Sequence, residues 1–174
     1  MKINDFETDL RYSYESSIEE FWDAVYKKAF PDLVNTEKCT DLHWQRQGVD
    51  RVINLSSGHT LHVDEKCRRE VYQDILLEYT SNDTTGSPGW IEKTLGIDYL
   101  AYAFMPIETV YLFPWQMLRR AWLHYGAEWK KEYKNVPAKN QGYTTWSVVV
   151  PIKVLRGAVN SATIIKLGSE SNGL

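Results

Sequence analysis

Hydrophobic residues recur along this chain with two different periods, and these periods predict where its helices and strands lie. Residues 16–30 and residues 115–133 show the 3.6-residue period of amphipathic helices, with Pro31 ending the first and Pro114 in the first turn of the second. The buried stripe predicted for the first helix comprises Ile18, Phe21, Trp22 and Val25. The stripe predicted for the second comprises Leu118, Ala121, Trp122, Tyr125 and Trp129. We therefore expect two helices, each with one face against a core.

Alternating polar and apolar positions predict strands in the rest of the chain. In chain order they are residues 50–55, 60–68, 74–79, the two arms of a hairpin over residues 98–113, and residues 143–150. The first two flank a polar turn and are expected to pair, and the third would complete a three-strand core over residues 50–79. Residues 151–159 fit a short helix and an extended run equally well.

The order helix, three strands, hairpin, helix, strand is typical of an α/β (α+β) protein with a central mixed β-sheet flanked by helices. The 174 residues contain no internal repeat or long linker, so we expect residues 1–174 to form a single domain. The content of 7 Trp and 11 Tyr is high. Aromatic side chains fill cores, and they also offer stacking surfaces to bases or sugars.

No segment indicates a membrane or secretion. No apolar run approaches the roughly 20 residues that span a bilayer, and the first residues contain no apolar signal-peptide core. Cys39 and Cys67 are too few for a disulfide framework. We therefore expect a cytoplasmic protein with no membrane partner.

The formal net charge of −3 is not evenly distributed. Residues 115–139 carry the basic residues Arg119, Arg120, Lys130, Lys131, Lys134 and Lys139 against the acidic Glu128 and Glu132. Such a stretch fits a phosphate-binding face and a plain solvated helix face equally well. Arg46, shortly before the strand at 50–55, fits a contact to a phosphate backbone and an ordinary surface loop equally well.

Two aspartates and a lysine are expected to meet at one end of the predicted hairpin. A turn centred near Ser57 puts Asp50 opposite Asp64, and residues two apart on a strand share a face, so Lys66 points the same way as Asp64. Two adjacent carboxylates repel unless a cation neutralises them, and Mg²⁺ prefers one or two carboxylates plus waters and phosphate oxygens. Lys66 would then orient a water or offset charge in the transition state. This is the chemistry of phosphodiester hydrolysis.

The residues Asp50 in GVDRVINL and Asp64 and Lys66 in HVDEK resemble the motif of the PD-(D/E)xK nuclease superfamily. Val49 stands where that pattern has Pro. The resemblance implies a restriction-endonuclease-like core, here with an inserted hairpin, and a metal-dependent nuclease using Mg²⁺ or Mn²⁺ to cleave nucleic acid. DNA is the expected substrate and a homodimer a possible assembly. It also implies catalytic roles for Asp50, Asp64 and Lys66, and a metal site of Asp50, Asp64 and Glu19 from the first helix.

Other interpretations of the same residues remain open. Asp64, Glu65 and Lys66 also fit a solvated strand end, and Asp50 a turn cap. Glu78 is a further candidate ligand if the third strand lies beside the second. The protein as a whole could instead be a non-catalytic nucleic-acid-binding or phage-derived accessory protein on the same scaffold, or an interaction module with an aromatic surface. If the protein binds nucleic acid, the candidate contacts are Arg46, Arg119, Arg120, Lys130 and Lys131.

Overall fold

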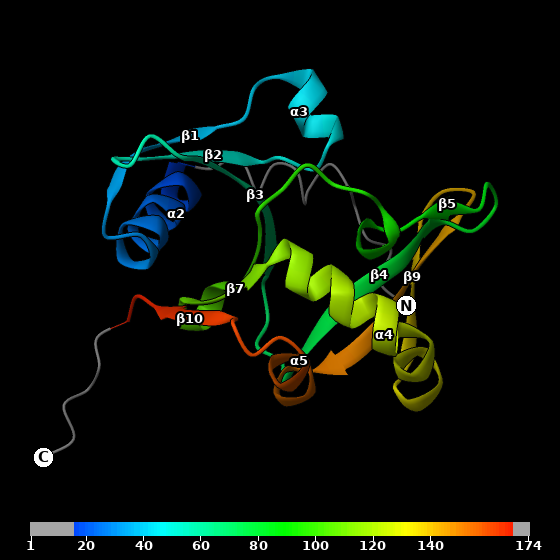
Figure 1. Cartoon of the computed structure of the whole chain (residues 1–174). Helices are drawn as coiled ribbons and strands as arrows, with labels where there is room; N and C mark the ends of the chain where they lie inside the picture. The colour runs from blue at the N-terminus through cyan, green and yellow to red at the C-terminus, as the bar shows by residue number, and fades with distance from the viewer. Residues whose placement is uncertain (1–15, 169–174) are drawn as a thin grey trace, which may run out of the picture.

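Residues 16–168 are described by a computed structural model, and they form two β-sheets with four α-helices packed around them (Figure 1). The helices are α2 (Ser16–Ala29), α3 (Leu42–Arg46), α4 (Trp115–Glu132) and α5 (Ile152–Ala158), with short 3-10 helices η1 (Trp90–Glu92) and η2 (Met105–Ile107). The strands are β1 (Leu33–Lys38), β2 (Arg51–Leu55), β3 (Thr60–Arg68), β4 (Asp74–Asn82), β5 (Ser87–Pro88), β6 (Tyr99–Phe104), β7 (Thr109–Pro114), β8 (Asn135–Lys139), β9 (Thr144–Pro151) and β10 (Thr163–Lys166).

The larger sheet has six strands in the order β1-β2-β3-β6-β7-β10, and the smaller has four in the order β5-β4-β9-β8. In the larger sheet β3 and β6 run parallel, whereas every other neighbouring pair is antiparallel. The sheet is therefore mixed, and the predicted α+β class with a central mixed sheet flanked by helices is confirmed. In the part of the chain that the structure describes, no helix is both long and apolar enough to cross a membrane.

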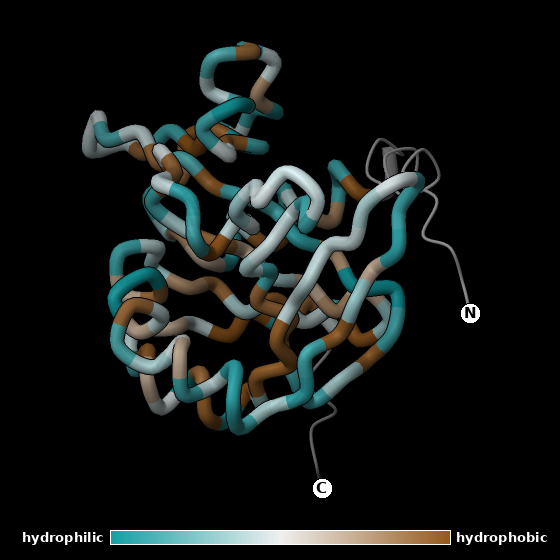
Figure 2. Tube along the Cα trace, turned by 90° about the vertical axis from the view of Figure 1, so that its right-hand side faces the viewer, coloured by the Kyte–Doolittle hydropathy of each residue, from teal (hydrophilic) through white to brown (hydrophobic). Residues whose placement is uncertain are grey.

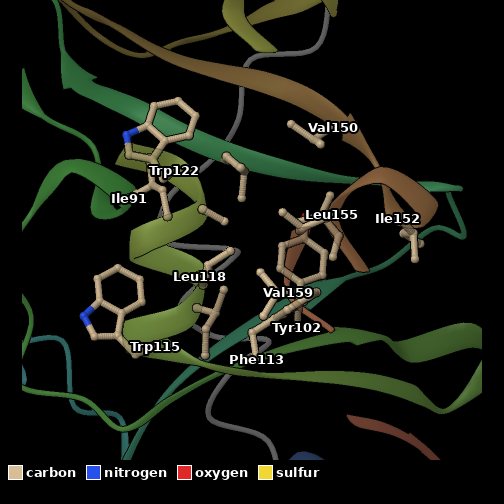
Figure 3. Packing of buried hydrophobic residues seen from close by; sticks show 14 of the residues in the cluster. Ile91, Tyr102, Phe113, Trp115, Leu118, Trp122, Val150, Ile152, Leu155 and Val159 are labelled. Carbon is tan, nitrogen blue, oxygen red and sulfur yellow. The ribbon is translucent and has the colours of Figure 1, made fainter. Parts of the chain in front are cut away.

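The six-stranded sheet separates two hydrophobic cores. One core lies between α2 and one sheet face, which contributes Ile53, Val63, Ala101, Ala103, Val110, Leu112 and Ile165. The other lies between the opposite face, which contributes Leu100, Tyr102, Phe104 and Phe113, and the smaller sheet with α4, α5 and η1. Figure 3 shows this second core, in which Leu118 of α4 lies toward Leu155 and Val159, while Trp122 lies on the side of Ile91. In Figure 2 the hydrophobic segments run mainly through the interior and the hydrophilic ones mainly along the periphery.

Both predicted helices are present, because each presents an apolar stripe to one of these cores. The four stripe residues predicted for α2 are all buried. The stripe of α4 also matches the prediction except at Tyr125, which is 38% exposed, while Gly126 is buried. The 98–113 hairpin appears as β6 and β7, the strand at 143–150 as β9, and the undecided segment 151–159 contains the short helix α5.

The predicted three-strand core over residues 50–79 is wrong in its third member. β4 does not lie beside β3 but pairs with β9 and β5 in the smaller sheet, where Ile75 and Leu77 are fully buried. The outer partner of β2 is instead β1, which precedes it in the chain. The sequence LVNTEK shows little apolar alternation, and β1 accordingly has no buried residue. The alternation of polar and apolar residues therefore did not predict this strand, which forms by pairing with the edge of β2.

Candidate functional site

The β2–β3 hairpin brings Asp50, the residue before β2, beside Asp64 of β3. Arg51 lies opposite Val63, and the backbone N–H of Asp50 donates to the carbonyl of that same Val63 at 2.9 Å, so the pairing is offset by one residue at Asp50. The Asp50 carboxylate accepts a hydrogen bond of 2.8 Å from the backbone N–H of Glu65. The predicted register therefore holds from Arg51 to Asn54 and is offset by one residue at Asp50, whose carboxylate is anchored to the strand that carries Asp64.

The short turn between these strands explains why the sequence predicts this register well. Gly58 has a φ of +84°, a left-handed conformation that an L residue adopts only at a cost, and its N–H donates to Leu55 at 2.9 Å. The backbone N–H of Leu55 in turn donates to His59 at 2.9 Å. Because this turn closes the hairpin tightly, pairing propagates from it without a slip as far as Arg51.

The carboxyl group of Asp64 is buried between a second carboxylate and an ammonium group. Asp64 is 3% exposed and accepts a hydrogen bond from Nζ of Lys66, whereas Asp50 is exposed. Burial raises the pKa of Asp64 to about 7, with the charge of Lys66 opposing and the charge and hydrogen bond of Asp50 adding to it. Two neighbouring carboxylates repel each other, so a negative charge on both Asp50 and Asp64 is disfavoured unless a cation binds beside them.

Lys66 remains positively charged although its side chain is only 34% exposed. Burial acts to lower its pKa, but the carboxylates of Asp64, Asp50 and Glu78 outweigh that effect and hold the pKa above its ordinary value. Three acidic groups, from β3, from β4 and from the residue before β2, therefore act on one ammonium group. A lysine held in this way is a fixed positive charge, not a proton donor or acceptor near neutral pH.

Glu78 reaches this group from β4 in the smaller sheet. Burial raises its pKa, while the charges of Lys66 and Lys93 and a hydrogen bond from the backbone N–H of Trp90 oppose the rise. Glu78 is a predicted ligand only if β4 lies beside β3, whereas β4 belongs to the smaller sheet. The structure brings Glu78 near Lys66 across the space between the two sheets instead.

The site occupies the sheet face that also bounds the second core. In the parallel pair of β3 and β6, Asp64 lies opposite Leu100 and Lys66 opposite Tyr102, both of which belong to that core. Within residues 16–168 no three Asp, Glu, His or Cys side chains converge closely enough to form a metal cage. Two carboxylates, those of Asp50 and Asp64, lie together here, and Mg²⁺ is an ion that usually takes one or two carboxylates and keeps several waters.

Glu19, predicted as a third metal ligand, lies on the other face of the sheet. Its carboxylate accepts a hydrogen bond of 2.6 Å from Nη2 of Arg51, whose side chain is 2% exposed. Lys38 lies 3.4 Å from the same carboxylate, and these two cations lower the pKa of Glu19 against the effect of burial. Arg51 lies opposite Val63, which packs in the core beneath α2, so Arg51 and its partner Glu19 lie on the face opposite Asp64 and Lys66.

On that same face Arg51 joins the two strands that carry the site. Its Nε donates to Glu65 at 2.6 Å, and Glu65 also accepts from the hydroxyl of Tyr26 in α2 at 3.0 Å. Burial raises the pKa of Glu65 to about 7, with Arg51 opposing. We name Arg51, Glu65, Glu19 and Tyr26 the rear network. It adjoins the site in sequence, since Arg51 follows Asp50 and Glu65 separates Asp64 from Lys66.

The predicted nucleic-acid contacts differ in how available their charges are. Arg46, Arg120 and Lys131 are exposed. Arg119 instead donates from Nη2 to the carbonyl of Glu92 at 3.0 Å. Lys130 lies over the rings of Tyr79 and Trp122, at 5.1 Å and 5.5 Å from their centroids. The basic stretch of α4 is therefore not a continuous row of solvated charges.

A tryptophan that the sequence analysis did not select lies beside this site. Trp44 of α3 is 39% exposed, and its ring centroid is 4.5 Å from that of His62. His62 is two residues before Asp64 on β3 and therefore shares its face. The alternation of residues 60–68 predicts that His62 shares a face with Asp64. The contact between His62 and Trp44 of α3 arises only in the folded chain.

Comparisons with protein-family models, with curated proteins and with solved structures found no match.

Proposed function

We propose that this protein is a metal-dependent nuclease that hydrolyses phosphodiester bonds, with DNA as the expected substrate. The observation that carries the proposal is the contact between the carboxyl groups of Asp50 and Asp64, with the ammonium of Lys66 bonded to Asp64. An ordinary solvated strand end would leave these groups exposed and separate. Here Asp64 is 3% exposed, and its pKa is raised to about 7.

The two aspartates fit one hydrated Mg²⁺ or Mn²⁺ ion, and each would supply a carboxylate oxygen. When bound, such an ion neutralises charge on the scissile phosphate and makes a water at the site more acidic. Exposed Asp50 gives the ion access from solvent, and the hydrogen bond from the N–H of Glu65 holds its carboxylate in place. Asp64 would release its proton as the ion binds, because metal ligands must be deprotonated.

Lys66 would place a fixed positive charge beside the reacting phosphate. Its ammonium has three donors, and one of them is used by Asp64, which leaves others to meet a phosphate oxygen or the attacking water. Such a contact contributes most where negative charge grows in the transition state. Glu78 would balance the charge of Lys66 from the other side of the site.

The proposal is tested by cleavage of labelled DNA and RNA strands and duplexes in Mg²⁺ or Mn²⁺, with EDTA as the metal-free control. We expect Asp64→Asn and Lys66→Met to reduce the single-turnover cleavage rate by about 100-fold or more. The matched controls are Asp32→Asn and Lys153→Met, which make the same chemical changes at exposed positions outside the site. Parental cleavage by Asp64→Asn, or equal rates in metal and in EDTA, would contradict the assignment.

A further inference from the structure

Trp44 stands out among the seven tryptophans of the chain, all of which lie within residues 16–168. The other six are buried or half-buried, whereas Trp44 is 39% exposed. A tryptophan that is left partly in water beside a charged site loses some of the benefit of burial. Filling a core therefore does not explain the position of Trp44.

The local structure holds Trp44 in place next to the proposed metal site. Asp41 caps α3 by accepting hydrogen bonds from the N–H groups of His43 and Trp44, at 2.7 Å and 3.2 Å. The carbonyl of Trp44 accepts from the N–H of Val49 at 3.0 Å, directly before Asp50. The segment from the α3 cap to the first aspartate of the site is thus tied together by its own backbone.

Side-chain contacts fix the ring itself from two sides. His62 lies against it, and Gly96 lies close enough that a Cβ there would come within 3.5 Å of Cζ3 of Trp44. The backbone N–H of Gly96 donates to Gln47, the residue after α3, at 2.9 Å. The tryptophan is therefore held by neighbours while a large part of its surface remains accessible.

The surroundings of Trp44 also suit a nucleic-acid strand. Arg46, on the same short helix, is exposed and carries a positive charge. Along the face of β3, His62 is followed two residues later by Asp64 and four residues later by Lys66, a spacing of roughly 7 Å per two residues. Successive nucleotides of an extended strand are separated by a similar distance, so a base at Trp44 would leave its backbone within reach of the carboxylates.

We propose that Trp44 stacks on an unpaired nucleobase next to the scissile phosphate, so that the site takes single-stranded or locally opened nucleic acid. The inference rests on the proposed nuclease function, because it uses the same face and the same substrate. Stacking requires an unpaired base, since the faces of a base within a duplex are covered by its neighbours. Aromatic stacking of this kind tolerates any base, because every base has a π-face.

The test measures binding in Ca²⁺, without cleavage, to three fluorescent probes of one length: a single strand, the corresponding duplex, and a strand with abasic positions in its centre. We expect the parent to prefer the single strand. Trp44→Ala should weaken that binding roughly tenfold, within the range known for loss of one base–aromatic stack. Affinity for the abasic strand should be the same in parent and variant, since no base is available to stack there.

Two further variants separate stacking from folding. Trp44→Phe keeps an aromatic ring and should retain most of the affinity, while losing the quenching of tryptophan fluorescence that the single strand causes in the parent. Tyr125→Ala removes an aromatic ring of similar exposure, 38%, from α4 and should bind like the parent. Equal single-strand affinity in Trp44→Ala and the parent, or equal loss on the abasic strand, would overturn the inference.

The outcomes for the nuclease proposal are distinct from these. Trp44-dependent binding without cleavage in Mg²⁺ or Mn²⁺ would remove the catalytic proposal and leave stacking in place. Cleavage that does not depend on Trp44, together with unchanged binding by Trp44→Ala, would remove stacking and leave the nuclease. A parent protein that binds none of the three probes would end both.

Discussion

At the scale of single residues, the site is governed by how burial acts on two carboxyl groups of different exposure. Asp50 is exposed and is held by a backbone N–H, whereas Asp64 is 3% exposed and has a pKa raised to about 7. Lys66 offsets only part of the cost of burying Asp64 as an anion. In the metal-free protein Asp64 is therefore partly protonated near neutral pH, which makes its charge responsive to a bound cation.

Removing this titration should change how the stability of the metal-free protein depends on pH. The folded pKa of Asp64 lies above its ordinary value of 3.8. Its contribution to the free energy of unfolding is therefore fully present below about pH 4 and is lost as pH rises towards about 7. A shift of this size corresponds to at most about 4 kcal/mol. In Asp64→Asn this loss is absent. The free energy of unfolding of the variant should therefore rise relative to that of the parent between pH 4.5 and 7.5.

Urea unfolding in EDTA at pH 4.5, 6 and 7.5 measures this difference. The control is Asp32→Asn, an exposed position, which should run parallel to the parent. A constant difference between Asp64→Asn and the parent across these pH values would mean that Asp64 has an ordinary pKa in the folded state.

At the scale of elements, the hairpin that carries the site is held from behind by the rear network. Arg51 follows Asp50 on β2, and Glu65 lies between Asp64 and Lys66 on β3, so their 2.6 Å hydrogen bond joins the strands one residue from the site. Glu19 and Tyr26 extend this connection to α2. Because side chains alternate along a strand, β3 presents Asp64 and Lys66 on one face of the sheet and Glu65, bonded to Arg51, on the other.

Breaking this ion pair from one side should be more harmful than removing both partners. Arg51→Met leaves the carboxylate of Glu65 buried without its cation, and we expect a loss of about 3–5 kcal/mol in the free energy of unfolding. The double variant Arg51→Met, Glu65→Leu should cost clearly less than the sum of the two single variants. Urea unfolding of the four proteins forms a double-mutant cycle that measures the coupling. Strictly additive effects would show that the pair contributes no specific interaction.

A matched arginine variant controls for the loss of positive charge. Arg120 is exposed on α4, so Arg120→Met should change the free energy of unfolding by less than about 0.5 kcal/mol. A loss at Arg120 comparable to that at Arg51 would point to a general charge effect.

At the scale of the whole molecule, the six-stranded sheet is shared by both hydrophobic cores. Alternate residues of β6 belong to different cores: Ala101 and Ala103 face α2, while Leu100 and Tyr102 face the smaller sheet. The site lies where this shared sheet meets β4, since Lys66 of β3 interacts with Glu78 of β4. Disrupting either core therefore also destabilises the shared sheet, and with it the other core and the site.

We expect the described part of the chain to unfold as one cooperative unit for this reason. Leu77→Ala, at a fully buried position in β4, should lower the free energy of unfolding by about 2–5 kcal/mol. The matched control is Leu123→Ala, since Leu123 is 72% exposed, and its effect should stay within about 0.5 kcal/mol. Far-ultraviolet circular dichroism and tryptophan fluorescence should report coincident transitions. Separate transitions for the two probes would show that the cores unfold independently.

The sequence by itself determined the features that depend on local periodicity. The stripes of α2 and α4, the β6–β7 hairpin and the β2–β3 register all follow from side-chain spacing and from one tight turn at Gly58. The approach of Asp50, Asp64 and Lys66 belongs to this group, because a hairpin register and a two-residue period suffice to predict it.

Only the tertiary structure decided the features that join distant segments. The polar and apolar pattern of a strand does not show which other strand it pairs with. It therefore could not predict the pairing of β1 with β2 or the parallel pairing of β6 with β3. Nor could it predict that β4 belongs to a second sheet. The family resemblance implied Glu19 as a metal ligand, and helix periodicity could not show that α2 covers the opposite sheet face, where Glu19 bonds Arg51. Trp44 reaches His62 only because β2 and β3 fold back beside α3. Long-range packing makes these choices, since it depends on which apolar surfaces are left to cover once the local elements have formed.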